Sequence, residues 1–448
     1  MADWNIHDFG AVADASTNAG PAIQAAVDAA HAAGGGRVII PAGTFLSGSV
    51  LLKSRVELHL VNGALLLSSL DPAEIAAFPH GADEGGVDGW NGGFFLGARD
   101  AENVVISGDG VIDGRGREVF SDADCDAGFH ECPKRCASFR PRLSLFENVT
   151  NLTIRDVTLK DAAFWTLHMA GCRHVRISGI RIQGDDRGAN NDGIDPDCCQ
   201  DVNISGCSVF TGDDAIVVKS TGPMAARYGV SEDIVICGCV LHSRDSALKI
   251  GTETHGVIRR VSLSDCMVQD CSRAVGIWVR DGGTVEDIHV HHLTGTVRRW
   301  GDAYDSPGAP GWWGKGEPVF ISATRRPQKP DSFPGVIRRV SFDHLYLTCE
   351  SSLFLGGETY SPIEDVRMSE IHLRFERTGT QPGGLFDEQP SARHKYPHAI
   401  PALYARSVRG LRLKDSTVRF VGEGEAWDGT LTELEDCDGS QVCWEEMA

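Results

Sequence analysis

One short phrase is repeated four times between residues 190 and 280, and this repetition indicates the fold. The four copies read NNDGIDPD (190–197), GDDAIVVK (212–219), RDSALKIG (244–251) and RAVGIWVR (273–280). In each copy a small residue precedes an aliphatic one, as in short strands of similar build. Consecutive strands that match in this way are typical of parallel stacking, in which equivalent positions lie roughly 4.8 Å apart.

A second phrase of alternating apolar and polar residues recurs along most of the chain. Its ten copies begin at residues 103, 151, 174, 201, 233, 260, 287, 339, 365 and 410. Most copies return after 23 to 32 residues, or after about twice that interval where a long loop intervenes. A fixed period of short strands without helices between them predicts an all-β solenoid, a parallel β-helix.

The whole chain, residues 1–448, is expected to form a single β-helix domain. Residues 1–36 would be an N-terminal cap, residues 37–420 the coils with their cleft loops, and residues 421–448 a C-terminal tail. A helix is expected at 21–30, because the apolar residues at positions 23, 26, 27 and 30 share one face. Long loops at 81–97, 115–142, 299–318 and 374–400 are expected to shape a cleft.

Composition and charge exclude several classes of protein. The chain has 448 residues, 42% of them hydrophobic, and 52 glycines, which suits an ordered and turn-rich protein. A formal net charge of -20 argues against nucleic acid and anionic membranes as partners. No stretch resembles a transmembrane helix. The first residues have neither a basic segment nor an apolar core for export, so we expect a cytoplasmic protein, with secretion after removal of a signal as the alternative.

Cysteines fall into two groups. Most lie in apolar strand patterns and are expected to be small buried hydrophobes. Cys125, His130, Cys132 and Cys136 instead share one polar loop. They could bind zinc, form a disulfide or remain free thiols, and the spacing does not decide between these states.

The first two copies of the repeated phrase predict a group of carboxylates. Stacking would place Asp192 above Asp214, with Asp213 beside them. Crowded carboxylates are costly to bury, and their mutual repulsion raises the pKa of one member. Two carboxylates that flank a glycosidic bond can protonate the leaving oxygen and activate water. The alternative is that these Asp residues only form turns.

The same stacking predicts the floor of the cleft. If Ile194, Ile216, Leu248 and Ile277 form one inward row, the next positions form an outward column of Asp195, Val217, Lys249 and Trp278. Two residues further on, the column is Asp197, Lys219, Gly251 and Arg280. Aromatic residues of the loops, Trp90, Trp300, Trp312 and Trp313, could stack on sugar rings or simply pack the loops.

At these residues the chain resembles glycoside hydrolase family 28, the polygalacturonase-like inverting hydrolases with a right-handed parallel β-helix. The likeness covers most of the chain, including DFGA (8–11), PAGTF (41–45), GDGVIDG (108–114) and WTLH (165–168). The family's Asn-Thr-Asp motif falls on residues 190–192 and its Gly-Asp-Asp motif on residues 212–214. The resemblance implies that Asp213 is the general acid, that Asp192 and Asp214 position the nucleophilic water, and that no cofactor or metal is needed.

Two departures from the family pattern bear on the substrate. Residues 245–247 are Asp-Ser-Ala where the family has Gly-His-Gly, and residues 278–280 are Trp-Val-Arg where it has Arg-Ile-Lys. An indole does not replace a bidentate grip on a uronate carboxylate. We therefore expect a carbohydrate substrate other than plain polygalacturonate, with Trp278 stacked on a neutral or differently substituted sugar. The alternative is an anionic substrate whose acidic group is held by Lys249 and Arg280. The expected substrate-binding residues are Asn190, Asp195, Lys219, Lys249, Glu253, Trp278, Arg280 and Trp312.

Three other functions fit the same scaffold. A polysaccharide lyase would need carboxylates that hold Ca²⁺ and a base that removes the proton beside a uronate. A glycan transferase or cyclising enzyme would need the same carboxylates and a site that excludes water. A glycan-binding β-helix without activity would need no crowded aspartates, so the aspartate group argues against it.

Overall fold

The computed structural model describes residues 2–78, 92–121, 134–136, 139–300, 314–379, 383–389, 391–422 and 427–445. The chain divides into two compact units. Unit 1 contains residues 1–124 and 134–212, and unit 2 contains residues 125–133 and 213–448. Helices are few, and no helix of the described residues is both long and apolar enough to cross a membrane.

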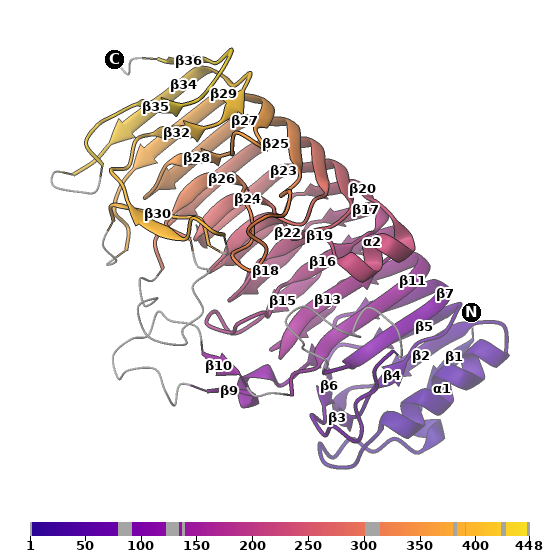
Figure 1. Ribbon diagram of the computed structural model, residues 1–448. Helices are drawn as coiled ribbons and strands as arrows, with labels where there is room; N and C mark the ends of the chain where they lie inside the picture. Colours follow the sequence, from indigo (N-terminus) through magenta and orange to yellow (C-terminus); the bar gives the residue numbers. More distant parts are fainter. Residues whose placement is uncertain are drawn as a thin grey trace. The chain divides into compact units, whose positions relative to one another are not determined.

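Unit 1 consists of three parallel stacks of strands (Figure 1). The first stack contains β4 (Val50–Leu51), β7 (Phe94–Gly108), β11 (Arg142–Arg155), β13 (Phe164–Ala170) and β16 (Ile194–Asp197). The second contains β1 (Asp3–Asn5), β2 (Gly36–Ile40), β5 (Val56–Leu60), the later parts of β7 and β11, β14 (Arg173–Ser178) and β17 (Gln200–Ser205). The third contains β3 (Gly43–Ser47), β6 (Ala64–Ser68), β8 (Val111–Asp113), β12 (Thr158–Lys160), β15 (Arg181–Gln183) and β18 (Ser208–Thr211). A chain that visits three parallel stacks in turn is a parallel β-helix, so the predicted fold is confirmed.

Unit 2 repeats this arrangement. Its first stack contains β19 (Ile216–Ser220), β22 (Ser246–Thr254), β24 (Arg273–Val279), β26 (Glu317–Ala323), β28 (Leu353–Gly356), β32 (Leu403–Arg406) and β35 (Thr432–Glu435). The other two stacks share long strands. β20 (Ser231–Cys237) and β21 (Val240–Ser243) both pair with the first long strand, β23 (Val257–Cys271). The later strands, which pair in turn, are β25 (Thr284–Val297), β27 (Val336–Cys349), β29 (Ile363–Phe375), β33 (Val408–Arg409), β34 (Arg412–Phe420) and β36 (Gln441–Trp444). β35 and β36 thus continue the stacks beyond residue 420. The single-domain organisation stays a prediction.

The remaining elements are short. Helix α1 (Gly20–Ala32) packs on β1, β2, β4 and β5 of unit 1 through buried residues that include Ile23 and Val27, so the expected capping helix is confirmed. Helix α2 (Gly222–Tyr228) follows β19. The described residues also form two antiparallel pairs, β9 (Phe120–Ser121) with β10 (Arg135–Cys136) and β30 (Leu385–Asp387) with β31 (Lys395–Pro397), and two short 3-10 helices, η1 (Ile6–Phe9) and η3 (Gly116–Glu118).

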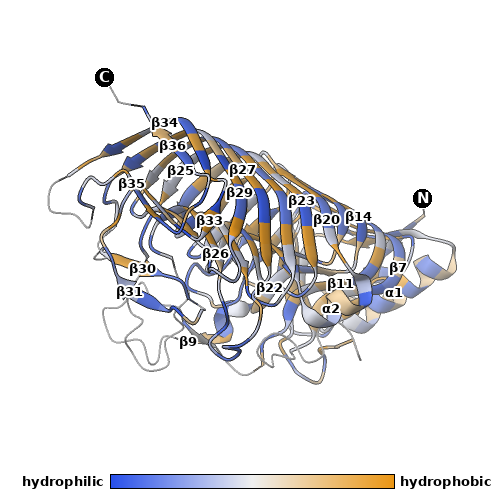
Figure 2. Ribbon diagram, turned by 45° about the horizontal axis from the view of Figure 1, so that its top comes forward, coloured by the Kyte–Doolittle hydropathy of each residue, from blue (hydrophilic) through white to orange (hydrophobic). Residues whose placement is uncertain are grey.

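The recurring second phrase marks a corner of the coil. The first residue of every copy, from Asn103 to Gly410, has a positive φ of 50–73°. Asn, Asp and Gly tolerate this left-handed conformation best, and they occupy seven of the ten positions. Beyond the corner, apolar side chains alternate with polar ones along the long strands of unit 2 (Figure 2). The apolar set forms the core.

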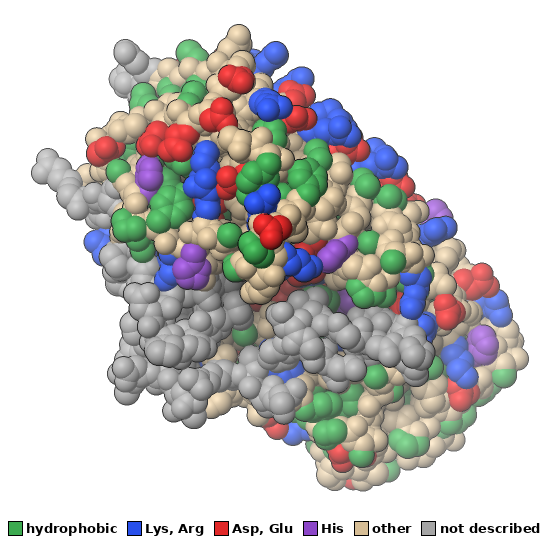
Figure 3. Space-filling model, in the orientation of Figure 1, with side chains coloured by type: hydrophobic (Ala, Val, Ile, Leu, Met, Phe, Trp, Pro, Cys, Tyr) green, Lys and Arg blue, Asp and Glu red, His purple; other side chains and the backbone are tan. Residues whose placement is uncertain are grey.

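Acidic and basic residues alternate at the same corner of unit 2. Arg260 donates to Asp233 at 2.6 Å, and Arg339 donates to Asp287 at 2.6 Å. Figure 3 shows basic and acidic side chains interleaved along the edge where Figure 1 draws β23, β25, β27 and β29. These exposed pairs contribute little to stability, but they balance charge along the edge.

Most strands of the first stack differ from those of the other stacks because they are buried on both faces. All residues of β16, β19, β24, β26, β28 and β32 are buried, whereas β14 and β17 alternate between buried and exposed residues. The outward side chains of the first stack nevertheless include charged ones such as Lys219, Arg273 and Glu317. Buried charges require partners, so this face is where a functional site is expected.

Candidate active site

Asp213 and Asp214 lie immediately before β19 in unit 2 and are 5% and 1% exposed. The Asp213 carboxylate accepts a hydrogen bond from the backbone N–H of Asp214 at 2.9 Å, and its backbone carbonyl accepts one from the hydroxyl of Ser243 at 2.7 Å. The turn is tied to the next coil because the N–H of Ala215 donates to the carbonyl of Ser246 at 2.9 Å. The two carboxylates are therefore held in a fixed turn.

Lys249 of β22 reaches the Asp214 carboxylate. Its Nζ lies 2.9 Å from Oδ2 of Asp214 and 3.4 Å from Oδ2 of Asp245. Burial raises the pKa of Asp214 to about 8, while Lys249 acts in the opposite direction. Burial also lowers the pKa of Lys249, but Asp214 and Asp245 outweigh it and leave that pKa above its ordinary value. The ammonium group is thus charged at neutral pH.

Asp245 is a member of the site that the sequence argument missed. It accepts from Nη1 of Arg273 at 3.1 Å and from the Ser246 hydroxyl at 3.0 Å. Arg273 lies 3.4 Å from Glu317 as well. A signal was present, because Asp245 occupies in the third copy of the phrase the position that Asp213 occupies in the second.

The register of β24 differs from the expected one by two residues. Val217 pairs with Lys249 as expected, but Lys249 pairs with Gly276, and Ile277 pairs with Ile250 instead of Leu248. Because a shift of two residues keeps every side chain on its face of the sheet, the apolar pattern alone does not reveal it. The predicted column that joined Lys249 to Trp278 is wrong by this shift.

Gly276 explains how Trp278 still meets Lys249. A Cβ atom at Gly276 would lie 2.2 Å from Cζ3 of Trp278, so the indole folds back over the glycine. The centroid of the indole ring lies 4.9 Å from Nζ of Lys249. The guanidinium carbon of Arg273 and the phenyl ring of Phe320 each lie 4.8 Å from the indole ring. Trp278 is 1% exposed. Stacking of Trp278 on a sugar stays a prediction, and in this structure cations and a phenyl ring surround the indole.

Arg280 is also enclosed. Its Nη1 donates to the hydroxyl of Thr324 at 2.8 Å, and its Nη2 donates to the carbonyl of Glu388 at 3.2 Å. Burial lowers the pKa of Arg280 to about 9. Both Nη groups of Arg280 thus donate to groups of the protein itself.

Lys219 and Glu253, two further predicted binding residues, pair with each other. Nζ of Lys219 lies 3.4 Å from Oε2 of Glu253, and Arg326 lies 3.8 Å from the other oxygen. Burial alone would raise the pKa of Glu253, but Lys219 and Arg326 outweigh it and lower that pKa. Lys219 lies near the end of β19, the strand that follows Asp213 and Asp214.

The β30–β31 hairpin covers the outer face of the first stack in unit 2. Glu388, just after β30, accepts from Ser322 of β26 at 3.3 Å and from Arg406 of β32 at 3.2 Å. Phe386 packs on Phe354 of β28 at 5.1 Å and on Tyr404 of β32 at 4.8 Å. No local sequence pattern predicts these contacts, because Ser322 and Arg406 are separated from Glu388 in the sequence and belong to other strands.

Three predicted site residues lie in unit 1. Asn190 accepts from Nη2 of Arg140 at 3.1 Å, and Asp192, 2% exposed, accepts at its carbonyl from the N–H of Thr166 at 2.8 Å. Asp195 is buried in β16 and pairs in register with His168 of β13. The predicted alignment of Asp192 with Asp214 stays a prediction.

Several predicted residues fall outside the described parts of the chain. These are Trp90, Trp312, Trp313, Cys125, His130 and Cys132, while only the backbone of Cys136 is described. Trp300 is described. It packs against the guanidinium groups of Arg298 and Arg244, and its indole N–H donates to the carbonyl of Asp270 at 2.7 Å. The contacts of Trp300 therefore agree with the alternative that it packs its loop.

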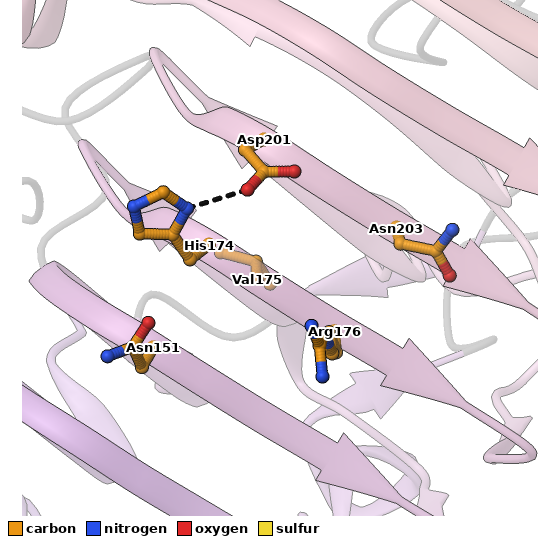
Figure 4. A pocket seen from close by; sticks show the side chains of 6 residues that line it. All are labelled: Asn151, His174, Val175, Arg176, Asp201 and Asn203. Atoms are coloured by element: carbon orange, nitrogen blue, oxygen red, sulfur yellow. Dashed lines mark hydrogen bonds and ion pairs between the residues drawn. The ribbon is translucent and has the colours of Figure 1, made fainter.

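A separate polar pocket lies on the second stack of unit 1 (Figure 4). It has a volume of about 300 Å³, and His174 pairs with Asp201 at 2.6 Å on its wall. It contains none of the predicted site residues, and both members of the pair are more than half exposed. We assign it no role.

Comparisons with known proteins agree with this architecture. The family model for glycosyl hydrolases family 28 matches residues 63–295, and a model for rhamnogalacturonase A/epimerase, pectate lyase-like proteins matches residues 4–61. A probable polygalacturonase of Vitis vinifera is 31% identical over 309 residues, covering 66% of this chain and 61% of its own length. A polygalacturonase of Gossypium barbadense is 27% identical and covers 64% of this chain and 66% of its own length. The chain therefore spans somewhat less than two thirds of these relatives.

Solved structures share the fold. The family 28 exopolygalacturonase of Yersinia enterocolitica superposes with a TM-score of 0.74 at 18% identity, covering 99% of this chain and 79% of that one. The exopolygalacturonase of Thermotoga maritima superposes with a TM-score of 0.66 at 24% identity, covering 86% and 89%. With the right-handed parallel β-helix and a family model that matches more than half of its residues, the chain belongs to glycosyl hydrolases family 28.

Proposed function

We propose that the protein is an inverting glycoside hydrolase whose catalytic carboxylates are Asp192, Asp213 and Asp214. The observation that carries this proposal is the buried Asp213–Asp214 turn, in which burial raises the pKa of Asp214 to about 8. Such a pair keeps a proton at neutral pH, and the glycosidic oxygen needs a proton to leave. In the reactive form this proton lies on Asp213 and Asp214 is ionised. Asp213 delivers the proton to that oxygen, while a water held by Asp192 and Asp214 attacks the anomeric carbon from the opposite face and transfers its own proton to the Asp214 carboxylate.

The test is a reducing-sugar screen against polygalacturonate, rhamnogalacturonan and a panel of neutral plant and microbial glycans. Wild type should release reducing ends from at least one of them, and Asp213→Asn should lose at least 100-fold in kcat. Proton NMR of the first product should show an inverted anomer. An unsaturated product that absorbs at 230 nm and a loss of activity with chelator would instead identify a lyase. A transferred or cyclised product would identify the transferase alternative, and unchanged glycan binding with no turnover a binding protein.

We further propose that the substrate differs from plain polygalacturonate. The support is that the cations of the first stack in unit 2 already have carboxylate or carbonyl partners: Lys219, Lys249, Arg273, Arg280 and Arg406. Gripping a uronate carboxylate would mean breaking one of these buried pairs. In the same screen, kcat/KM should be at least tenfold higher on another glycan than on polygalacturonate. The reverse order would refute this part of the proposal.

We also propose that cleavage starts from a chain end. The support is the β30–β31 hairpin, because its contacts with β26, β28 and β32 occupy the face along which a long glycan would extend. The first products should be mono- or disaccharides with little early loss of viscosity. Glu388→Gln weakens the attachment of the hairpin through Arg406, and should increase the share of longer products. An early fall in viscosity with wild type would contradict chain-end action.

A further inference from the structure

Lys249 is the best-anchored cation beside the proposed catalytic pair. It is 9% exposed, and its ammonium group faces Oδ2 of Asp214 at 2.9 Å, Oδ2 of Asp245 at 3.4 Å and the ring of Trp278 at 4.9 Å. A side chain placed to bind a sugar would keep donors directed at open space. Here the partners belong to the protein, which argues against the substrate contact that the sequence suggested.

The Asp214 carboxylate has a donor on each oxygen. Oδ1 accepts from the backbone N–H of Ser246 at 3.2 Å, and Oδ2 faces Lys249. Both donors belong to β22 of the neighbouring coil, because Ser246 is the first residue of this strand and Lys249 lies within it. With one oxygen bound by backbone and the other by an ammonium group, the plane of the carboxylate is set before any substrate arrives.

Lys249 is held from its far side by a chain of alternating charges. Arg273 binds Asp245 at 3.1 Å, and Asp245 faces Lys249. Glu317 in turn lies 3.4 Å from Arg273. Because each member is buried between opposite charges, Lys249 has little freedom to turn toward a ligand.

We propose that Lys249 is a positioning residue for Asp214, whose ammonium group fixes the orientation and the charge of that carboxylate. This inference rests on the proposed function and deepens it. The charged groups that face Asp214 within unit 2 are Asp213 and Lys219 from β19 and its turn, and Asp245 and Lys249 from β22 and its turn. Among them Lys249 is the one in ion-pair contact with Asp214.

The charge of Asp214 depends on this contact for a physical reason. Burial and the carboxylates of Asp245 and Asp213 all favour the protonated form, while Lys249 and Lys219 favour the ionised form. Without Lys249 the carboxyl would remain protonated to higher pH. A carboxyl that has to hold water and accept its proton would then become active only at a higher pH than in the wild type.

The experiment compares Lys249→Met with wild type in two independent measurements. Met keeps the length of the side chain and removes its charge. First, Asp carboxyl groups labelled with ¹³C are titrated by NMR, with Asp214→Asn identifying the signal. The apparent pKa of Asp214 should rise by about 1–3 units in Lys249→Met. Second, kcat and KM are measured against pH on the best glycan of the screen. The acidic limb of kcat should move up by a similar amount, while KM changes less than threefold.

Two further variants complete the design. Lys249→Arg keeps the charge and should restore most of both shifts, which also guards against a fold defect in Lys249→Met. Lys219→Met removes a cation of the same stack that pairs with Glu253 instead of Asp214, and should move the Asp214 titration much less. A KM raised more than tenfold with an unmoved acidic limb would overturn the proposal and make Lys249 a substrate ligand. An unchanged Asp214 titration in Lys249→Met would overturn the proposal about Lys249 regardless of activity. A shifted titration in a protein that cleaves no glycan would refute only the proposed function.

Discussion

Gly276 provides the sharpest test of how the site is packed. Replacing it with Ala adds a Cβ that would lie 2.2 Å from Cζ3 and 2.8 Å from Cη2 of Trp278. Both distances are far below van der Waals contact, and the ring is backed by Phe320 and Arg273 at 4.8 Å each. The indole therefore has to move as a unit. Overpacking of this kind costs about 1–3 kcal/mol of the free energy of unfolding.

The assay is urea unfolding followed by far-ultraviolet circular dichroism and by tryptophan fluorescence. A lower midpoint at unchanged m value identifies a loss of stability. Gly222→Ala is the matched control, because a Cβ there would meet nothing closer than 3.5 Å and the glycine begins helix α2. We expect that change to be neutral or slightly stabilising.

A double variant isolates the contact. Trp278→Phe removes the part of the ring that the new Cβ would strike, so Gly276→Ala should cost less in that background, with a coupling of at least about 0.5 kcal/mol. If Gly276→Ala is as stable as Gly222→Ala, the indole does not lie over residue 276. The argument that Trp278 caps Lys249 would then fail with it.

Three other changes test the core and the buried charges, each measured by urea unfolding. Leu248→Ala truncates a fully buried side chain of β22 and should cost about 2–5 kcal/mol; a cost below 1 kcal/mol would contradict its place in the core. Arg273→Met leaves Asp245 and Glu317 without their shared cation and should cost about 3–5 kcal/mol, whereas a neutral result would mean that these carboxylates are not buried. Burial raises the pKa of Asp387 from 3.8 to about 6, so the folded state binds the extra proton and loses up to ~3 kcal/mol of stability as the pH rises through this window. Asp387→Asn should lack that loss, and identical slopes between pH 4 and 7 in both proteins would refute the assignment.

Much of the fold follows from local pattern. The first residue of each copy of the second phrase is usually one that tolerates a positive φ, and the residues after it alternate between core and solvent. These two properties are set within a few residues, so the corners and coils of the helix could be predicted. The register of β24 could not, because a shift of two residues leaves the same apolar face inside.

The site was predictable in part for the same reason. Asp213, Asp214 and Lys249 occupy positions that the repeat makes comparable, and the structure brings Lys249 to Asp214. Asp245 occupies a comparable position too, and only its ion pair with Arg273 reveals a role. Glu388 and the β30–β31 hairpin have no counterpart in the repeat, so nothing in the local sequence signals that they cover the first stack.

The sequence by itself therefore determined the parallel coil, its corners, its capping helix and the carboxylates of the proposed site, because these depend on the period of the chain and on backbone preferences of single residues. Only the tertiary structure decided the environment of the side chains. The indole of Trp278 reaches the ammonium group of Lys249 because Gly276 has no side chain and leaves room for the ring. Whether Lys249 binds substrate or holds Asp214 depends on carboxylates from neighbouring coils. Burial and charge pairing are properties of neighbours in space, which spacing along the chain does not specify.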